Sequence, residues 1–172
     1  MRWSGGIGHA CKFAGVLVIA FVLAACSRHN PSKEYGLGGE GPATPGTERD
    51  FAVNVGDTVH FQEDSPALTG EAQGILRSQA RWLNQYPQYT ITIEGHADER
   101  GTREYNLALG ARRAMTVRTF LARQGVNAVR IRTLSYGKER PIATCDAPSC
   151  WTQNRRAQTI LNDRGGAVAR NY

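Results

Sequence analysis

One short segment, residues 94–102, gathers several reactive side-chain types: Glu94-Gly95-His96-Ala97-Asp98-Glu99-Arg100-Gly101-Thr102. Its carboxylates Glu94, Asp98 and Glu99 could include the acid pair of a glycosidase. His60 and His96, together with carboxylates, could hold a metal ion. An acid of the segment and a distant arginine could instead clamp a ligand that carries both an ammonium and a carboxylate group. The remaining alternative is a solvated loop with surface ion pairs.

The elements around this segment predict one α/β domain, with residues 94–102 where a strand ends and a helix begins. Six elements are expected: strand 58–61, helix 69–86, strand 89–94, helix 103–124, strand 129–136 and strand 156–161. Thr69 is a candidate N-cap of the first helix, and Pro87 ends that helix. Apolar residues at helical spacing predict one buried face on the second helix: Leu107, Ala111, Ala114, Val117 and Leu121. The order β-α-β-α-β-β predicts an α/β sandwich, with one sheet and two helices packed on one face.

The N-terminus carries signals for export and lipid attachment. Arg2 and Lys12 precede an uncharged run that begins at Phe13 and is too short for a spanning helix, which needs about 20 residues. Residues 1–25 therefore read as a secretory signal peptide. The run ends in Leu23-Ala24-Ala25-Cys26, which resembles the lipobox of bacterial lipoproteins, where Cys26 would receive lipid on its sulfur. The mature protein is expected to be anchored to a membrane without spanning it.

The rest of the chain divides into a linker, a domain and a short tail. Residues 26–50 are rich in Pro and Gly and are expected to form a flexible linker behind the lipidated cysteine. Residues 51–164 are expected to form the domain, and residues 165–172 the tail. Loss of residues 1–25 lowers the formal net charge from +6 to +4, too weak a signal to choose a polyanionic partner. Nucleic acid is not expected, because the arginines lack interleaved aromatic residues and the compartment is wrong.

The cysteines follow the same division. Cys11 leaves with the signal peptide and Cys26 is the lipidation site, so Cys145 and Cys150 remain in the domain. In an exported protein, a pair this close is most simply a disulfide that closes a small loop. The alternative is half of a metal site, but no His or second Cys pair lies nearby in the sequence. No metal and no cofactor is therefore expected.

Further motifs extend the segment 94–102 into a pattern that resembles the OmpA-like C-terminal domain family. They are Glu104-Tyr105-Asn106, Leu109-Gly110, Arg112-Arg113-Ala114, Ser135-Tyr136-Gly137-Lys138-Glu139 and Asn154-Arg155-Arg156-Ala157. The match spans about residues 58–161. Together with the lipobox, it is most similar to the lipid-anchored, peptidoglycan-associated branch of that family.

The resemblance implies binding rather than catalysis. Members of the family grip peptidoglycan noncovalently through meso-diaminopimelate, whose side-chain end carries an amino and a carboxyl group. Asp98 would accept the ammonium group, and Arg113 would meet the carboxylate with a planar guanidinium. Leu109, one turn before Arg113 on the same helix face, would line the pocket. Thr102 and the loop around Asp64 also fall on contact positions of the family, the latter through backbone N–H groups.

The resemblance also implies a location and partners. The protein would be an outer-membrane lipoprotein that faces the periplasm and belongs to the Tol-Pal system, with TolB and, as a further candidate, TolA as protein partners. It would support envelope integrity and cell division. One alternative is a lipid-anchored wall binder outside the Tol-Pal system. Another is a wall-cleaving enzyme that uses Glu94 and Asp98, although no G-x-S-x-G or H-E-x-x-H element is present in the sequence.

Two departures from the family pattern lie beside the expected site. The loop Gln62-Glu63-Asp64-Ser65-Pro66 keeps the aspartate but lacks the aromatic residues that often neighbour it. Arg103 stands where the family commonly has proline. Arg155 and Arg156 are expected to brace the domain against Glu94 or Asp98 rather than to contact ligand.

Overall fold

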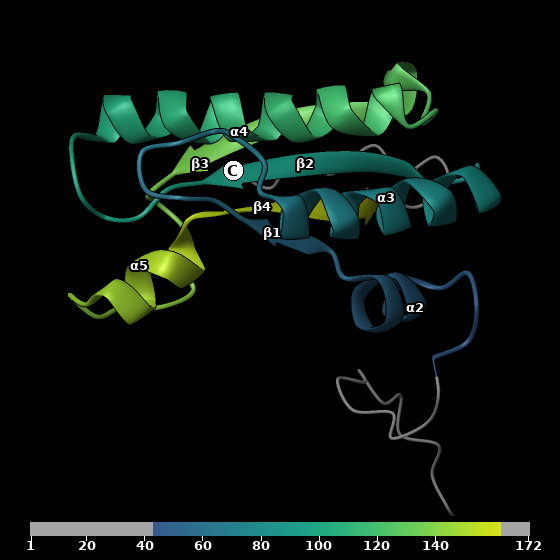
Figure 1. Ribbon diagram of the computed structural model, residues 1–172, viewed down its shortest axis with the longest axis horizontal. Coiled ribbons are helices and arrows are strands. Elements are labelled where there is room, and N and C mark those ends of the chain that lie inside the picture. The colour runs from purple at the N-terminus through teal and green to yellow at the C-terminus, as the bar shows by residue number, and fades with distance from the viewer. Residues whose placement is uncertain (1–42, 163–172) are drawn as a thin grey trace, which may run out of the picture. The chain divides into compact units, whose positions relative to one another are not determined.

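The computed structural model describes residues 43–162, and within them the predicted order of elements appears with additions (Figure 1). The strands are β1 (Thr58–His60), β2 (Thr90–His96), β3 (Ile131–Gly137) and β4 (Arg156–Asn162). The helices are α2 (Glu48–Asp50), η2 (Phe51–Val55), α3 (Gly70–Gln85), α4 (Arg103–Arg123), η3 (Ala128–Arg130) and α5 (Pro148–Asn154). The predicted signal peptide, the lipidation site Cys26, most of the predicted linker and the tail 165–172 lie outside the described residues. Within residues 43–162, no helix is long and apolar enough to cross a membrane.

The four strands form one sheet in the order β1-β4-β2-β3. β2 and β3 are parallel, because α4 provides the long crossover that a parallel pair needs, and the other pairs are antiparallel. Both long helices lie on one face of the sheet, with α4 over β2 and β3 and α3 beside it, nearer β1 (Figure 1). The predicted α/β sandwich, with two helices on one face of one sheet, is confirmed.

Helix α3 forms where its sequence pattern predicts. The Thr69 side chain accepts a hydrogen bond from the backbone N–H of Ala72 and caps the first turn. Five apolar residues recur at helical spacing along this segment; Ala72, Leu76, Ala80 and Leu83 are buried in the core, and Ile75 is partly buried against it. The core therefore lies between the sheet and the two long helices.

Helix α4 lies unusually close to the sheet because glycines face each other across the contact. A side chain on Gly95 of β2 would overlap the backbone carbonyl of Gly110 on α4, and one on Gly110 would overlap the hydroxyl of Ser135 on β3. The Ser135 hydroxyl in turn donates to the carbonyl of Leu107 at 2.7 Å. This close approach fixes the height of α4 above the end of β2, where residues 94–102 begin.

The buried face of α4 differs from the predicted one. Leu107 is 45% exposed and Ala111 is also exposed, whereas Ala114, Val117 and Leu121 are buried as expected. The buried stripe continues towards the helix N-terminus through polar and small residues instead: Asn106, Leu109, Gly110 and Arg113. A pattern based on apolar residues alone could not find this stripe, because most of these four positions are not apolar.

The packed part of the chain begins earlier than the predicted boundary at residue 51. Thr47 caps the short helix α2, and Asp50 at its end is only 8% exposed. The Asp50 carboxylate accepts hydrogen bonds from Trp82 Nε1 at 2.8 Å and from the backbone N–H of Gly46 at 2.9 Å. The domain boundary at residue 51 stays a prediction, but the structure holds the residue just before it, because the Asp50 side chain, which composition assigns to solvent, accepts hydrogen bonds from Trp82 and Gly46.

Candidate binding site

A pocket of about 280 Å³ opens at the end of the sheet where β2 leads into α4. Its walls come from the β1–α3 loop, the β2–α4 loop and the first half of α4. The residues that line it are Glu63, Asp64, Asp98, Arg100, Gly101, Tyr105, Asn106, Leu109 and Arg113. The structure thus brings together four of the predicted site residues, Asp98, Arg113, Leu109 and Asp64. Thr102 is not among the lining residues.

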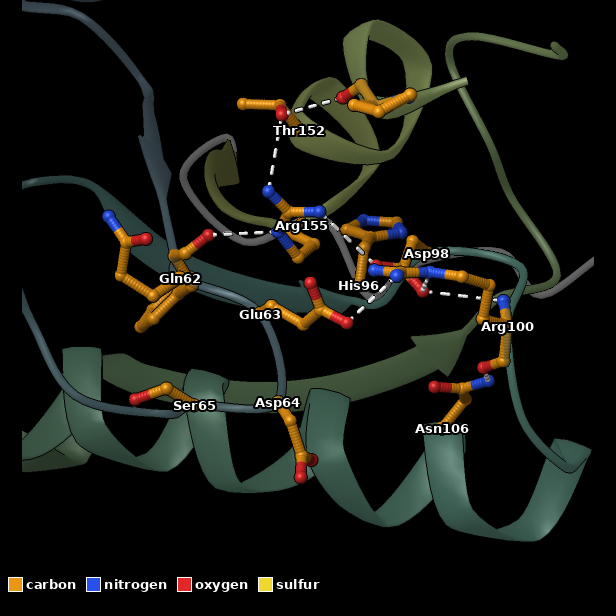
Figure 2. Close-up of polar contacts among 12 residues, drawn as sticks. Gln62, Glu63, Asp64, Ser65, His96, Asp98, Arg100, Asn106, Thr152 and Arg155 are labelled. Carbon is orange, nitrogen blue, oxygen red and sulfur yellow. Dashed lines mark hydrogen bonds and ion pairs between the residues drawn. The ribbon is translucent and has the colours of Figure 1, made fainter. Parts of the chain in front are cut away.

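Asp98 lies at the centre of a group of charged side chains (Figure 2). Its residue is only 7% exposed, and its Oδ2 atom lies 2.7 Å from Arg100 Nη2 and 3.3 Å from Arg155 Nη1. Burial alone would raise the pKa of Asp98, but the hydrogen bonds and charges of Arg100 and Arg155 outweigh it and lower that pKa. Asp98 is therefore ionised at neutral pH, which suits a contact with a cation.

Arg100 joins Asp98 to two other parts of the molecule. Its Nη1 atom lies 2.8 Å from Glu63 Oε1 in the β1–α3 loop. On the other side, its guanidinium lies 4.1 Å from the ring centroid of Trp151 on α5, as a cation–π contact. Asn106 Nδ2 donates to the Arg100 carbonyl at 2.6 Å, which ties this loop to α4. The cation beside Asp98 is thus held from three directions.

Arg113 is fully buried, with no exposed surface, so it is not a surface charge of α4. Its guanidinium donates to three backbone carbonyls: Ser65 at 3.0 Å, His96 at 2.8 Å and Gln62 at 3.0 Å. Burial lowers the pKa of Arg113 to about 10, while the nearby charge of Asp98 favours its protonated form. The side chain therefore stays charged at neutral pH, and it joins the β1–α3 loop to the end of β2.

The other predicted residues have distinct placements. Leu109 is buried and forms the apolar part of the pocket wall. Asp64 is exposed, adopts a positive φ of 50°, and accepts a hydrogen bond from the Tyr105 hydroxyl. Thr102 is the N-cap of α4, and its hydroxyl accepts from the backbone N–H of Tyr105 at 3.2 Å. Thr102 therefore acts on the pocket by fixing the start of α4, directly after the lining residue Gly101.

Arg155 braces Asp98, as the sequence predicts. The sequence gives no comparable signal for Trp151, which lies far along the chain in a helix that sequence patterns did not identify. Glu63 contacts Arg100, and the sequence offers one indirect sign of this role. Glu63 adjoins Asp64 in the loop that departs from the family pattern. Arg156 behaves differently from Arg155, because it is buried near Glu94 and does not line the pocket.

The alternative chemistries find less support in the geometry. Asp98 lines the pocket while Glu94 and Glu99 do not, and its lowered pKa makes it a poor proton donor. His60 lines a different pocket, of about 330 Å³, and His96 is buried. In the part of the chain that the structure describes, no group of three or more His, Cys, Asp or Glu side chains could hold a metal ion.

The predicted disulfide between Cys145 and Cys150 is present, with a Cα–Cα distance of 5.7 Å. It closes the loop that leads into α5, where Cys150 is buried. The amide of Asn154, at the end of α5, also binds this loop, accepting from the N–H of Ile142 at 2.9 Å and donating to the carbonyl of Ala143 at 2.8 Å. α5 is therefore fixed at both ends beside Asp98.

Comparisons with known proteins match the part of the chain that contains this pocket. Residues 60–162 match the model of the OmpA family. A peptidoglycan-associated lipoprotein of Agrobacterium fabrum is 58% identical over 153 residues, which cover 87% of this chain and 86% of the relative. One from Pseudomonas aeruginosa is 40% identical, over 86% of this chain and 94% of the relative. The crystal structure of the peptidoglycan-associated lipoprotein from Burkholderia pseudomallei has a TM-score of 0.60 and 42% identity, covering 62% of this chain and 90% of that chain.

Proposed function

Because the chain belongs to the OmpA family, we propose that it is an outer-membrane lipoprotein that binds peptidoglycan noncovalently from the periplasmic side. The names of its relatives support both halves of this proposal, since they describe lipoproteins that associate with peptidoglycan. The lipobox at Leu23–Cys26 supports the anchor. Two or more acyl chains at Cys26 would hold the protein stably at a membrane.

The observation that carries the proposal is a fixed anion and a fixed cation in one pocket, Asp98 and Arg113. The matching ligand is a zwitterion, and the side-chain end of meso-diaminopimelate in the wall peptide is one. A guanidinium has five N–H donors, of which Arg113 gives three to carbonyls; the other two would meet a carboxylate once the ligand parts the contacts over this buried side chain. Asp98 would receive the ammonium group.

The remaining wall of the pocket fits the rest of such a ligand. Leu109 offers an apolar surface to the methylene groups of diaminopimelate. The positive φ of Asp64 turns the β1–α3 loop at the pocket, where its backbone N–H groups can meet the peptide. Thr102 would contribute at the α4 start. Each charged hydrogen bond contributes about 1.5–3 kcal/mol, so the affinity of a single site is modest. Tethering raises the effective concentration towards millimolar, which makes this affinity sufficient to link a membrane to the wall.

The same proposal extends to the wider envelope. The protein would tether the outer membrane to the wall within the Tol-Pal system, with TolB as a partner and TolA as a further candidate, and would support envelope integrity during cell division. Capture of TolB by the purified protein would distinguish this role from that of a general wall binder. Release of soluble fragments from purified wall would instead indicate a cleaving enzyme.

A sedimentation experiment tests the binding mode. The mature chain, residues 26–172, would be mixed with purified diaminopimelate-type peptidoglycan and, separately, with lysine-type peptidoglycan, which has the ammonium but lacks the side-chain carboxylate. We expect sedimentation with the first and little with the second. Asp98→Asn and Arg113→Lys should stay in solution, while the exposed neighbours Glu99→Gln and Arg112→Gln should sediment normally. Equal binding to both walls would refute the clamp, and failure to bind either would refute the function.

A further inference from the structure

Helix α5 approaches the pocket with two side chains that contact its charged residues. Trp151 stacks on Arg100 at 4.1 Å, and Arg155, directly after α5, lies 3.3 Å from Asp98. Figure 2 shows Arg155 between Thr152 of α5 and Asp98. We infer that α5 is a positioning element of the binding pocket, in which Trp151 holds Arg100 and Arg155 holds Asp98 in the arrangement that a cationic ligand group meets. The inference rests on the proposed function for the identity of the ligand.

Arg155 acts as a fixed strut between three elements. Its Nε atom donates to the Phe61 carbonyl at 3.2 Å, Nη2 donates to the Thr152 hydroxyl at 3.1 Å, and Nη1 faces Asp98. Its side chain is only 12% exposed, so water competes little for these bonds. Because Nε and Nη2 are both held, the direction in which Nη1 points is fixed. Arg155 therefore orients the Asp98 carboxylate, which Nη1 faces.

Arg100 is held differently. It is 35% exposed and contacts both Asp98 oxygens, Oδ2 from Nη2 at 2.7 Å and Oδ1 from Nε at 3.3 Å. Because each carboxylate oxygen can accept more than one hydrogen bond, an ammonium group can meet Asp98 beside Arg100. The Trp151 face and Glu63 hold the Arg100 guanidinium from its other sides.

Two cations contact Asp98, Arg100 of the β2–α4 loop and Arg155 after α5, and a third, Arg113 of α4, lines the same pocket. Glu63 and Asp64 are the anions of the same pocket. Of the three cations, α5 positions Arg100 and Arg155. Loosening α5 should therefore make Asp98 easier to protonate, and binding should fail at a higher pH than in the unaltered protein.

The disulfide connects this effect to the Cys145–Cys150 loop. Because the bond closes the chain at the start of α5, its loss would let Trp151 move while Arg155 stays held by the Phe61 carbonyl, just after β1, and by Asp98. Replacement of both cysteines by serine should thus resemble Trp151→Ala more than Arg155→Met. No change in the fold of the sheet is needed for this effect.

The test measures binding of a soluble diaminopimelate-containing muropeptide to the mature chain by calorimetry across pH, with each variant first shown to be folded. Arg155→Met should weaken binding about tenfold and Trp151→Ala about twofold to fivefold. Both should raise the pH midpoint for loss of binding by about half a unit. Trp151→Phe should restore most of the loss, and Gln153→Ala, exposed on the same helix, should behave as the unaltered protein.

Two further measurements separate positioning from a general loss of structure. In an Arg100→Met background, Trp151→Ala should have no further effect on the pH midpoint, because its effect acts through Arg100. NMR titration of the Asp98 carboxyl carbon without ligand should show a raised pKa in Trp151→Ala and Arg155→Met. Unchanged Asp98 titration in both variants would refute the inference. If the unaltered protein fails to bind the muropeptide, the proposed function falls, while the ligand-free titration still decides the role of α5.

Discussion

Arg113 on α4 donates from Nη1 to the backbone carbonyl of His96 on β2 at 2.8 Å, two residues before Asp98. The proposed carboxylate-binding residue is thus also a support of the strand end that presents the proposed ammonium-binding residue. Its other bonds, to Gln62 and Ser65, hold the opposite loop of the pocket. One buried side chain therefore sets the distance between the two sides of the site.

Replacement of Arg113 should cost stability as well as binding. Arg113→Ala leaves three carbonyls without their donor, and we expect the free energy of unfolding to fall by about 3 kcal/mol or more. Arg113→Lys should lose less, because an ammonium keeps the charge but cannot span three carbonyls. Denaturant unfolding measures both. Arg112→Ala, on the exposed side of the same helix, should change stability by less than about 0.5 kcal/mol. Equal losses for Arg112 and Arg113 would contradict this role.

Periodicity and caps were sufficient to predict the sheet and the long helices. Thr69 and its apolar repeat located α3, because local hydrogen bonding and burial agree there. The same reasoning misplaced the buried face of α4, because Arg113 and Gly110 are buried for reasons of hydrogen bonding and close approach that no apolar pattern records. α5 was missed because a disulfide and the Asn154 side chain fix it, rather than an apolar repeat.

The candidate site was predictable only in part. Family resemblance named Asp98, Arg113, Leu109 and Asp64, and the structure gathers them in one pocket. His96, named in the sequence as a possible metal ligand, contributes instead through its backbone carbonyl, which accepts from Arg113. Contacts such as that of Arg100 with Trp151 join residues about 50 positions apart and depend on how loops pack, which spacing along the chain cannot encode.

The close approach of α4 to the sheet gives a prediction with a matched control. Gly110→Ala would place a methyl group against the Ser135 hydroxyl and the Gly95 backbone, so α4 must move outward. We expect a loss of roughly 1–3 kcal/mol in the free energy of unfolding. Gly74→Ala, in the interior of α3 with nothing within 4 Å of the new methyl group, should be neutral or stabilising by up to about 1 kcal/mol. Thermal and denaturant unfolding should therefore show a lower free energy of unfolding for Gly110→Ala than for Gly74→Ala.

Residues 43–50 should contribute to the stability of the domain. Hydrogen bonds from Trp82, Asn54 and Gly46 lower the pKa of Asp50, so its carboxylate is favoured in the folded state. A chain that begins at residue 51 should melt at a lower temperature than one that begins at residue 43, and its Trp82 fluorescence should shift to the red. Asp50→Ala in the longer chain should reproduce most of the change, whereas Glu48→Ala, exposed in the same short helix, should not. Identical melting of the two chain lengths would support the boundary at residue 51.

His96 should make stability depend on pH in a defined window. Burial, with the nearby charges of Arg156 and Arg140, lowers the pKa of His96 from 6.5 to about 4, so the folded state disfavours its protonation. The unfolded chain binds this proton as pH falls below about 6.5, which costs stability progressively until about pH 4, where the folded protein also binds it. The full loss is about 3 kcal/mol.

The ring of His96 can be replaced by phenylalanine with one electrostatic contact to account for. Neither ring nitrogen has a hydrogen-bond partner among residues 43–162, the ring stacks on Tyr136 with their centroids 5.6 Å apart, and Nε2 lies 4.0 Å from Glu94 Oε2. Burial raises the pKa of Glu94, which opposes the trend, so the difference between the two proteins is the quantity to compare. Denaturant unfolding between pH 7 and 4 should show a steeper loss of stability in the unaltered protein than in His96→Phe. Parallel pH profiles would show that His96 carries its charge equally well in the folded and unfolded states.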